Sequence, residues 1–153
     1  MGIADYKITK APNSLITVGL GSCVGIALYN QKKNLGSLLH IMLPDSSNFK
    51  DKSKWEKFAD LAIPKVVDEI AGGQPDELVA KIAGGASLFN FNSQSKSLQI
   101  GKRNIEMVKH TLEELEIPIL GEHVGGDSGR TMMVDLESFD VTVRMVNRDI
   151  YHI

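Results

Sequence analysis

The chain contains a single cysteine, Cys23, and its surroundings favour a role as a nucleophile. It lies in the run 17–25, Thr-Val-Gly-Leu-Gly-Ser-Cys-Val-Gly, where a glycine-rich turn precedes an apolar stretch typical of a strand. One cysteine cannot form an internal disulfide, and with four scattered histidines it does not readily supply the ligands of a structural zinc site. A lone cysteine with a histidine elsewhere, here His40, is a recognised starting point for a cysteine enzyme.

The thiolate is the attacking form of cysteine, so Cys23 needs a base, and His40 is the candidate. The β-prone runs 23–29 and 36–43 flank the polar turn 30–34, which predicts a hairpin. Cross-strand partners in that hairpin have numbers summing to about 63 to 66. If the sum is odd, Cys23 and His40 lie on the same face of the sheet, as direct partners at 63 or as diagonal partners at 65. If the sum is even, they lie on opposite faces.

Two further features fit a catalytic site. Thr17 ends the preceding strand and could hold the imidazole in the correct tautomer. Glycines at 19, 21 and 25 leave the backbone open, so amide N–H groups around Gly21 and Ser22 could stabilise an oxyanion or support the turn. Each of these residues also has a purely structural explanation. Cys23 could be a small buried apolar residue and His40 a core histidine. Thr17 could simply favour a strand, and the glycines could allow a bulge or a tight turn.

Length and charge exclude several classes of function. At 153 residues the chain fits one domain, 1–153, and its net charge of −2 gives no argument for a nucleic-acid or anionic-membrane partner. The sequence lacks both a run of about 18 apolar residues and the features of a signal peptide, so we expect no membrane insertion. A single cysteine suits a reducing compartment, and we expect a cytoplasmic protein.

Strand-rich flanks with two interposed helices predict a mixed α/β (α+β) domain built in layers. Apolar spacing indicates helices over 55–70 and 105–115, with Ser53 as a cap for the first and Pro64 marking a kink or a fresh start. The expected strands lie at 14–18, 23–29, 36–43, 78–83, 119–124, 131–136 and 139–146. The roles of Arg130 and of the Phe89/Phe91 segment stay open, between structural elements and docking groups.

Five runs in order resemble the CheD family of chemoreceptor glutamine deamidases: Gly-Leu-Gly-Ser-Cys-Val-Gly at 19–25, His-Ile-Met-Leu-Pro at 40–44, Gly-Gly-Ala at 84–86, Ile-Gly-Lys-Arg-Asn at 100–104 and Gly-Gly-Asp-Ser-Gly-Arg at 125–130. The resemblance spans nearly the whole chain. It implies a layered α/β/β/α sandwich with mixed sheets, similar to cysteine hydrolases of the cytotoxic-necrotizing-factor type. It also implies a triad of nucleophile Cys23, base His40 and orienting Thr17.

The activity implied by the resemblance is deamidation of selected glutamines on methyl-accepting chemoreceptors, with no metal or organic cofactor. Such a site should be a shallow cleft with a partly exposed thiol, and the phosphatase CheC is the implied second partner. Two alternatives remain: an adaptor that docks CheC or receptors with little catalysis, and a cysteine hydrolase of another amide, such as a peptidase. Which glutamines are modified and the oligomeric state are not encoded in recognisable motifs.

Overall fold

The computed structural model describes residues 1–72, 77–87 and 99–153. Phe89 and Phe91 lie outside these residues. The strands are β1 (Tyr6–Lys10), β2 (Ser14–Leu20), β3 (Val24–Asn30), β4 (Leu35–Ile41), β5 (Leu78–Gly84), β6 (Ile119–Val124), β7 (Arg130–Asp135), β8 (Asp140–Met145) and β9 (Ile150–His152). The helices are the short 3-10 helix η1 (Trp55–Lys57), α1 (Ala59–Ala71) and α2 (Ile100–Glu114).

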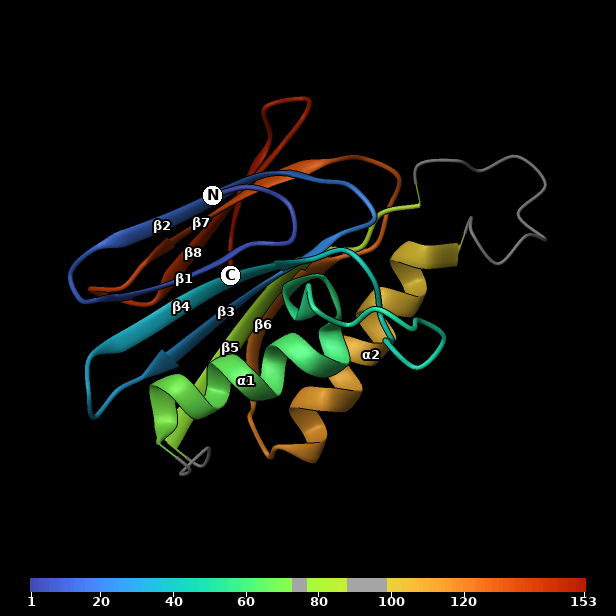
Figure 1. Cartoon of the computed structure of the whole chain (residues 1–153). Helices are drawn as coiled ribbons and strands as arrows, with labels where there is room; N and C mark the ends of the chain where they lie inside the picture. The colour runs from blue at the N-terminus through green and yellow to red at the C-terminus, as the bar shows by residue number, and fades with distance from the viewer. Residues whose placement is uncertain (73–76, 88–98) are drawn as a thin grey trace.

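The strands form two sheets, stacked face to face (Figure 1). Sheet A has the order β1-β4-β3-β5-β6 and is antiparallel except for the parallel β5–β6 pair. Sheet B has the antiparallel order β2-β7-β8-β9. The expected α+β class with two sheets is therefore confirmed, although only sheet A is mixed, whereas the resemblance implied mixed sheets.

Helices α1 and α2 cover the same face of sheet A, and sheet B covers the other face (Figure 1). In the described part of the chain the layers run helices, sheet A, sheet B. The second helical layer of the expected α/β/β/α sandwich has no counterpart among those residues, where Ile16, Met133 and Ile150 of sheet B are exposed. None of the helices in the described ranges has the length and apolar character needed to cross a membrane.

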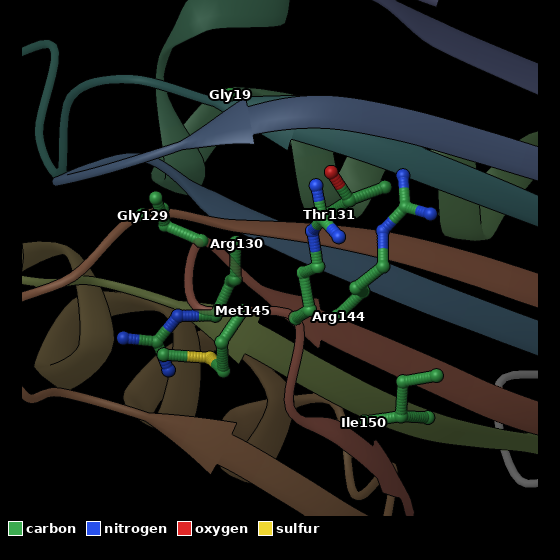
Figure 2. Close-up of a pocket in the computed structure, with 9 residues that line it drawn as sticks. Gly19, Gly129, Arg130, Thr131, Arg144, Met145 and Ile150 are labelled. Carbon is green, nitrogen blue, oxygen red and sulfur yellow. The ribbon is translucent and has the colours of Figure 1, made fainter.

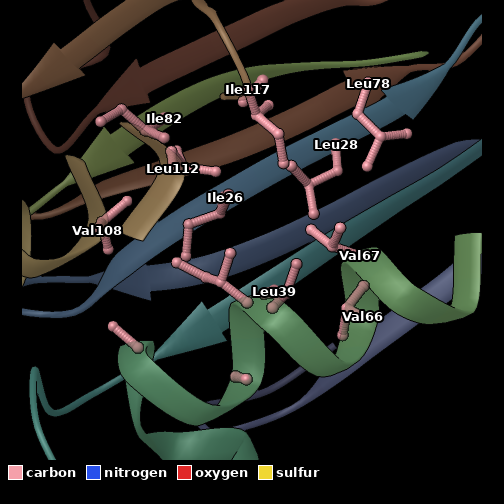
Figure 3. Packing of buried hydrophobic residues seen from close by; sticks show 14 of the residues in the cluster. Ile26, Leu28, Leu39, Val66, Val67, Leu78, Ile82, Val108, Leu112 and Ile117 are labelled. Atoms are coloured by element: carbon pink, nitrogen blue, oxygen red, sulfur yellow. The ribbon is translucent and has the colours of Figure 1, made fainter. Parts of the chain in front are cut away.

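Strand β3 is buried on both faces, which explains its continuous apolar sequence. Ile26 and Leu28 point toward the helices, where Val66 of α1 and Leu112 of α2 complete the cluster (Figure 3). Ala27, between them, faces sheet B, as side chains alternate along a strand. Burial of the large apolar side chains Val24, Ile26 and Leu28 on the helix face stabilises this strand by about 1.5–3 kcal/mol for each side chain. The hairpin that carries the candidate nucleophile and base is thus anchored at the centre of the fold.

Candidate active site

The β3–β4 hairpin places Cys23 and His40 on one face of sheet A. The register pairs Gly25 with His40 and Val24 with Ile41, which is the odd sum of 65. Cys23 directly precedes β3, so it lies diagonally across from His40. The residue opposite His40 is Gly25, and the space that a side chain would take there is occupied by the side chains of Met132 and Leu20. The face they share is the one that packs on sheet B.

Thr17 reaches this place from the other sheet. Its Oγ1 lies 2.7 Å from Nδ1 of His40, and both residues are fully buried. Strand β2 belongs to sheet B and β4 to sheet A, so this hydrogen bond joins the two sheets. The structure therefore brings together Thr17 and His40, which are 23 positions apart in the chain, on the face that also carries Cys23.

The hydrogen bonds of Thr17 define the tautomer of His40. The hydroxyl also lies 3.2 Å from the carbonyl oxygen of Met1, which can only accept. Both contacts are hydrogen bonds only if the hydroxyl donates to Met1 and accepts from an Nδ1–H of His40. The ring then carries its lone pair on Nε2, which is buried and has no partner among the described residues. That nitrogen is free to take a proton.

Burial keeps both members of the pair uncharged at neutral pH. Removal from water disfavours the imidazolium form and lowers the pKa of His40 to about 4. Burial likewise raises the pKa of the Cys23 thiol, an effect that is partly offset by a hydrogen bond from its own backbone N–H. The resting site is therefore a neutral imidazole beside a neutral thiol, and a preformed ion pair is not favoured.

The thiol is less accessible than the sequence led us to expect. Cys23 is 9% exposed and packs within the cluster between the sheets, against residues such as Leu20 and Met132. A hollow of about 740 Å³ lies elsewhere, at the end of β2, where Gly19, Arg130 and Arg144 are among the lining residues (Figure 2). Cys23 does not line this hollow. The expectation of a partly exposed thiol is therefore corrected to a nearly buried one.

The backbone of the turn before Cys23 is held in a specific shape. Gly19 has a φ of +73°, which favours glycine, and the N–H of Gly21 donates to its carbonyl. Ala86 N–H donates to Gly21 O and Gly85 N–H donates to Cys23 O, each at 2.8 Å. Gly21 thus supports the turn through both of its backbone groups. The Ser22 N–H makes no backbone hydrogen bond in the described part of the chain.

Gly101 lets helix α2 approach the segment that holds this turn. A Cβ on Gly101 would clash with the carbonyl oxygen of Ala86 and lie 2.7 Å from that of Gly85. We expect Gly101→Ala to lower the free energy of unfolding by about 1–3 kcal/mol, despite the better helix propensity of alanine. Urea denaturation measures this, with Gly2→Ala as the control because no atom lies within 4 Å of its Cβ position. Equal stability of the two variants would contradict the packing argument.

Arg130 organises the glycine-rich loop that precedes it. Its guanidinium donates to the carbonyl oxygens of His123 at 2.8 Å and Ser128 at 3.1 Å, and also to that of Gly125. The side chain is nearly buried, and no carboxylate contacts it in the described part of the chain. The loop is therefore held as a structural turn by its own arginine, in agreement with the structural alternative for this run.

Fold and site first define a class: an α+β protein in which a Thr–His pair joins two packed sheets next to the chain's one cysteine. The family model described as "CheD chemotactic sensory transduction" matches residues 42–145. The chain belongs to the CheD family. This match begins after Thr17, Cys23 and His40, so it does not itself include them.

Relatives at about 50% identity extend the likeness over most of the chain. Proteins from Moorella thermoacetica (53% identical, 97% of this chain and 90% of the relative) and Desulforamulus reducens (52%, 95% and 89%) are described as "Probable chemoreceptor glutamine deamidase CheD". A protein from Clostridium botulinum with the same description is 51% identical over 95% of this chain and 91% of its own. Among solved structures, the hypothetical protein YfiH of Bacillus licheniformis gives a TM-score of 0.45 at 17% identity, covering 78% of this chain and 49% of that one.

Proposed function

We propose that this chain is a cytoplasmic protein-glutamine deamidase that converts glutamine side chains of methyl-accepting chemoreceptors to glutamate and ammonia. The names of its relatives support the reaction and the substrate class. The single observation that carries the mechanism is the 2.7 Å contact between Thr17 Oγ1 and His40 Nδ1, which leaves Nε2 as a free base on the face of Cys23.

In the proposed reaction His40 Nε2 takes the thiol proton as Cys23 Sγ attacks the Cδ of the substrate amide. The negative charge on the amide oxygen is stabilised by the Ser22 N–H. The C–N bond breaks, and ammonia leaves with the proton carried by His40. Water then attacks the thioester, giving its proton to His40, and the glutamate carboxyl and the free thiol are released.

The neutral pair predicts an unusual pH profile. Protonated His40 cannot accept the thiol proton, so activity is lost as the pH falls through the pKa of His40, which is about 4. We expect kcat/KM for receptor deamidation to be level at neutral pH and half-maximal near pH 4 on the acid side. Ammonia release measured between pH 3.5 and 8 tests this, with receptor and enzyme folding monitored by circular dichroism at each pH. An acid midpoint near 6.5 would show that burial does not set the basicity of His40.

The proposed function is tested by incubating receptor cytoplasmic fragments with the enzyme and measuring peptide masses. Each converted glutamine gains about one dalton, because an amide nitrogen is replaced by oxygen. Peptide cleavage without this mass change would indicate a hydrolase of another amide. Absence of both changes, with binding to receptors or CheC intact, would indicate an adaptor. Docking of CheC on this chain stays a prediction, which Cys23→Ala tests by binding measurements without turnover.

A further inference from the structure

Asn104 of helix α2 lies directly behind the turn that carries the proposed nucleophile. It is fully buried, and the two hydrogens of its side-chain nitrogen are both used. Nδ2 donates to the carbonyl oxygen of Ser22 at 2.9 Å and to that of Met42 at 3.1 Å. One amide group thus contacts the residue before Cys23 and the residue two positions after His40.

These two carbonyls lie where the β3–β4 ladder ends. Val24 and Ile41 form the last pair, and the Met42 N–H turns away to donate to Lys57 O at 3.0 Å. Beyond this pair, no β3–β4 ladder hydrogen bond joins the segment before β3 to the segment after β4. The amide of Asn104 bridges them instead, and so connects the turn of the cysteine to the strand of the histidine.

The bond to Ser22 also orients the thiol's nearest donor. In a trans peptide the carbonyl of one residue and the N–H of the next point in opposite directions. Since Asn104 holds the Ser22 carbonyl toward α2, it directs the Cys23 N–H to the other side, where this N–H lowers the pKa of the thiol and partly offsets the effect of burial. Loss of the Asn104 amide would free the peptide group to rotate, which would reduce this lowering and disfavour the thiolate.

The other half of the Asn104 amide argues against a merely space-filling role. Its Oδ1 is buried without a hydrogen-bond partner among the described residues. A buried acceptor without a partner is unfavourable, and an apolar residue of similar size would avoid this cost. The asparagine is therefore suited to its place by its two donor hydrogens.

We propose that Asn104 is a positioning residue of the deamidase, which holds the cysteine turn and the histidine strand in register for reaction. The inference rests on the proposed function for its effect on turnover, but its effect on the thiol can be measured without substrate. It acts through the backbone of Ser22 and Met42 and has no assigned contact with the substrate.

The test compares Asn104→Leu, which removes both donors at similar size, with Asn30→Leu as a matched control. Asn30 is also fully buried and also donates from Nδ2 to a carbonyl, that of Ile70 at 2.9 Å, but it ends β3 at the opposite end from Cys23. Asn104→Ala is the second variant, in case leucine does not fit. All are assayed well below their unfolding temperatures.

Cys23 is the only thiol, so its alkylation by iodoacetamide against pH reports on this one group. We expect substitutions at both Asn104 and Asn30 to lower the free energy of unfolding. Only the Asn104 variants should shift the alkylation midpoint upward, by about one pH unit, and lower kcat by about 100-fold while KM changes less than about twofold. If the Asn104 variants shift the alkylation midpoint but the wild-type protein does not deamidate receptors, the proposed function is wrong and the positioning role of Asn104 is supported. Alkylation and turnover equal to those of Asn30→Leu would overturn the inference.

Discussion

Cys23→Ala is expected to abolish deamidation of receptor fragments, with a loss of about 10⁵-fold or more, because no other group can form the covalent intermediate. The chain has no second thiol that could replace it. Alanine is smaller than cysteine but equally apolar, so the cluster between the sheets should tolerate it at a modest cost in stability. Peptide mass spectrometry of the receptor measures the conversion.

The matched control is Cys23→Ser, which replaces the thiol by a hydroxyl at similar size and so supplies a far weaker nucleophile at this position. Both variants should bind receptor fragments as wild type does, because each changes a single γ atom of a nearly buried residue. Conversion that persists in the alanine variant would remove the sulfur from the mechanism, whatever its effect on binding.

His40→Gln carries the second largest expected effect, a loss of about 10⁴-fold in kcat with little change in KM. Glutamine fills a similar volume and can still accept or donate a hydrogen bond, but it cannot take the thiol proton. The acid limb of the pH profile near pH 4 should disappear with the imidazole. Steady-state ammonia release, measured with the same receptor fragment, gives both results.

Two substitutions of Thr17 test whether its hydroxyl fixes the tautomer of His40. Thr17→Val keeps the shape but removes the group that accepts from His40 Nδ1, so we expect a loss of about 100-fold in kcat. Thr17→Ser keeps the hydroxyl and should retain most of the activity. Equal rates in the valine and serine variants would show that the 2.7 Å contact between the sheets is structural only.

Local sequence patterns predicted the central strands and the edge strands β2 and β6, but missed the edge strands β1 and β9. The β-prone runs of the sequence correspond to β2, β3 and β4, with boundaries differing by one or two residues. Strands β1 and β9 were not predicted, because the first is short and carries two lysines and the second has only exposed side chains. Which strand joins which sheet depends on long-range pairing, and single-sequence patterns do not contain that information.

The start of the first helix shows how tertiary packing overrides local signals. Ser53 was predicted as its cap, but α1 begins at Ala59 after η1, and the N-cap Phe58 makes no side-chain cap hydrogen bond. Pro64 lies inside α1 and does not begin it. Burial of neighbouring residues such as Ile63 and Val66 in the core compensates for the hydrogen bond that proline cannot make.

The residues of the candidate site differ in how far the sequence predicted their roles. Residue type singled out Cys23 and His40, and strand alternation limited the hairpin register to two parities, of which the structure has the odd one. The position of Thr17 at the end of a predicted strand suggested an orienting hydroxyl, and the resemblance to the CheD family implied the same role, but no local pattern showed that the contact crosses between sheets. The Met1 carbonyl and the bridging role of Asn104 had no signal of their own, because they depend on backbone oxygens that come together only in the folded chain.

The most direct test of the account is to trap the covalent intermediate on the sulfur. Enzyme mixed with a glutamine-containing receptor peptide is quenched in acid within milliseconds to seconds, and its intact mass and proteolytic fragments are measured. The account predicts an adduct on the fragment containing Cys23 with the mass of the peptide less about 17 Da, the mass of the released ammonia. Turnover of the peptide with no such adduct in wild type, together with unchanged turnover in Cys23→Ala, would contradict it.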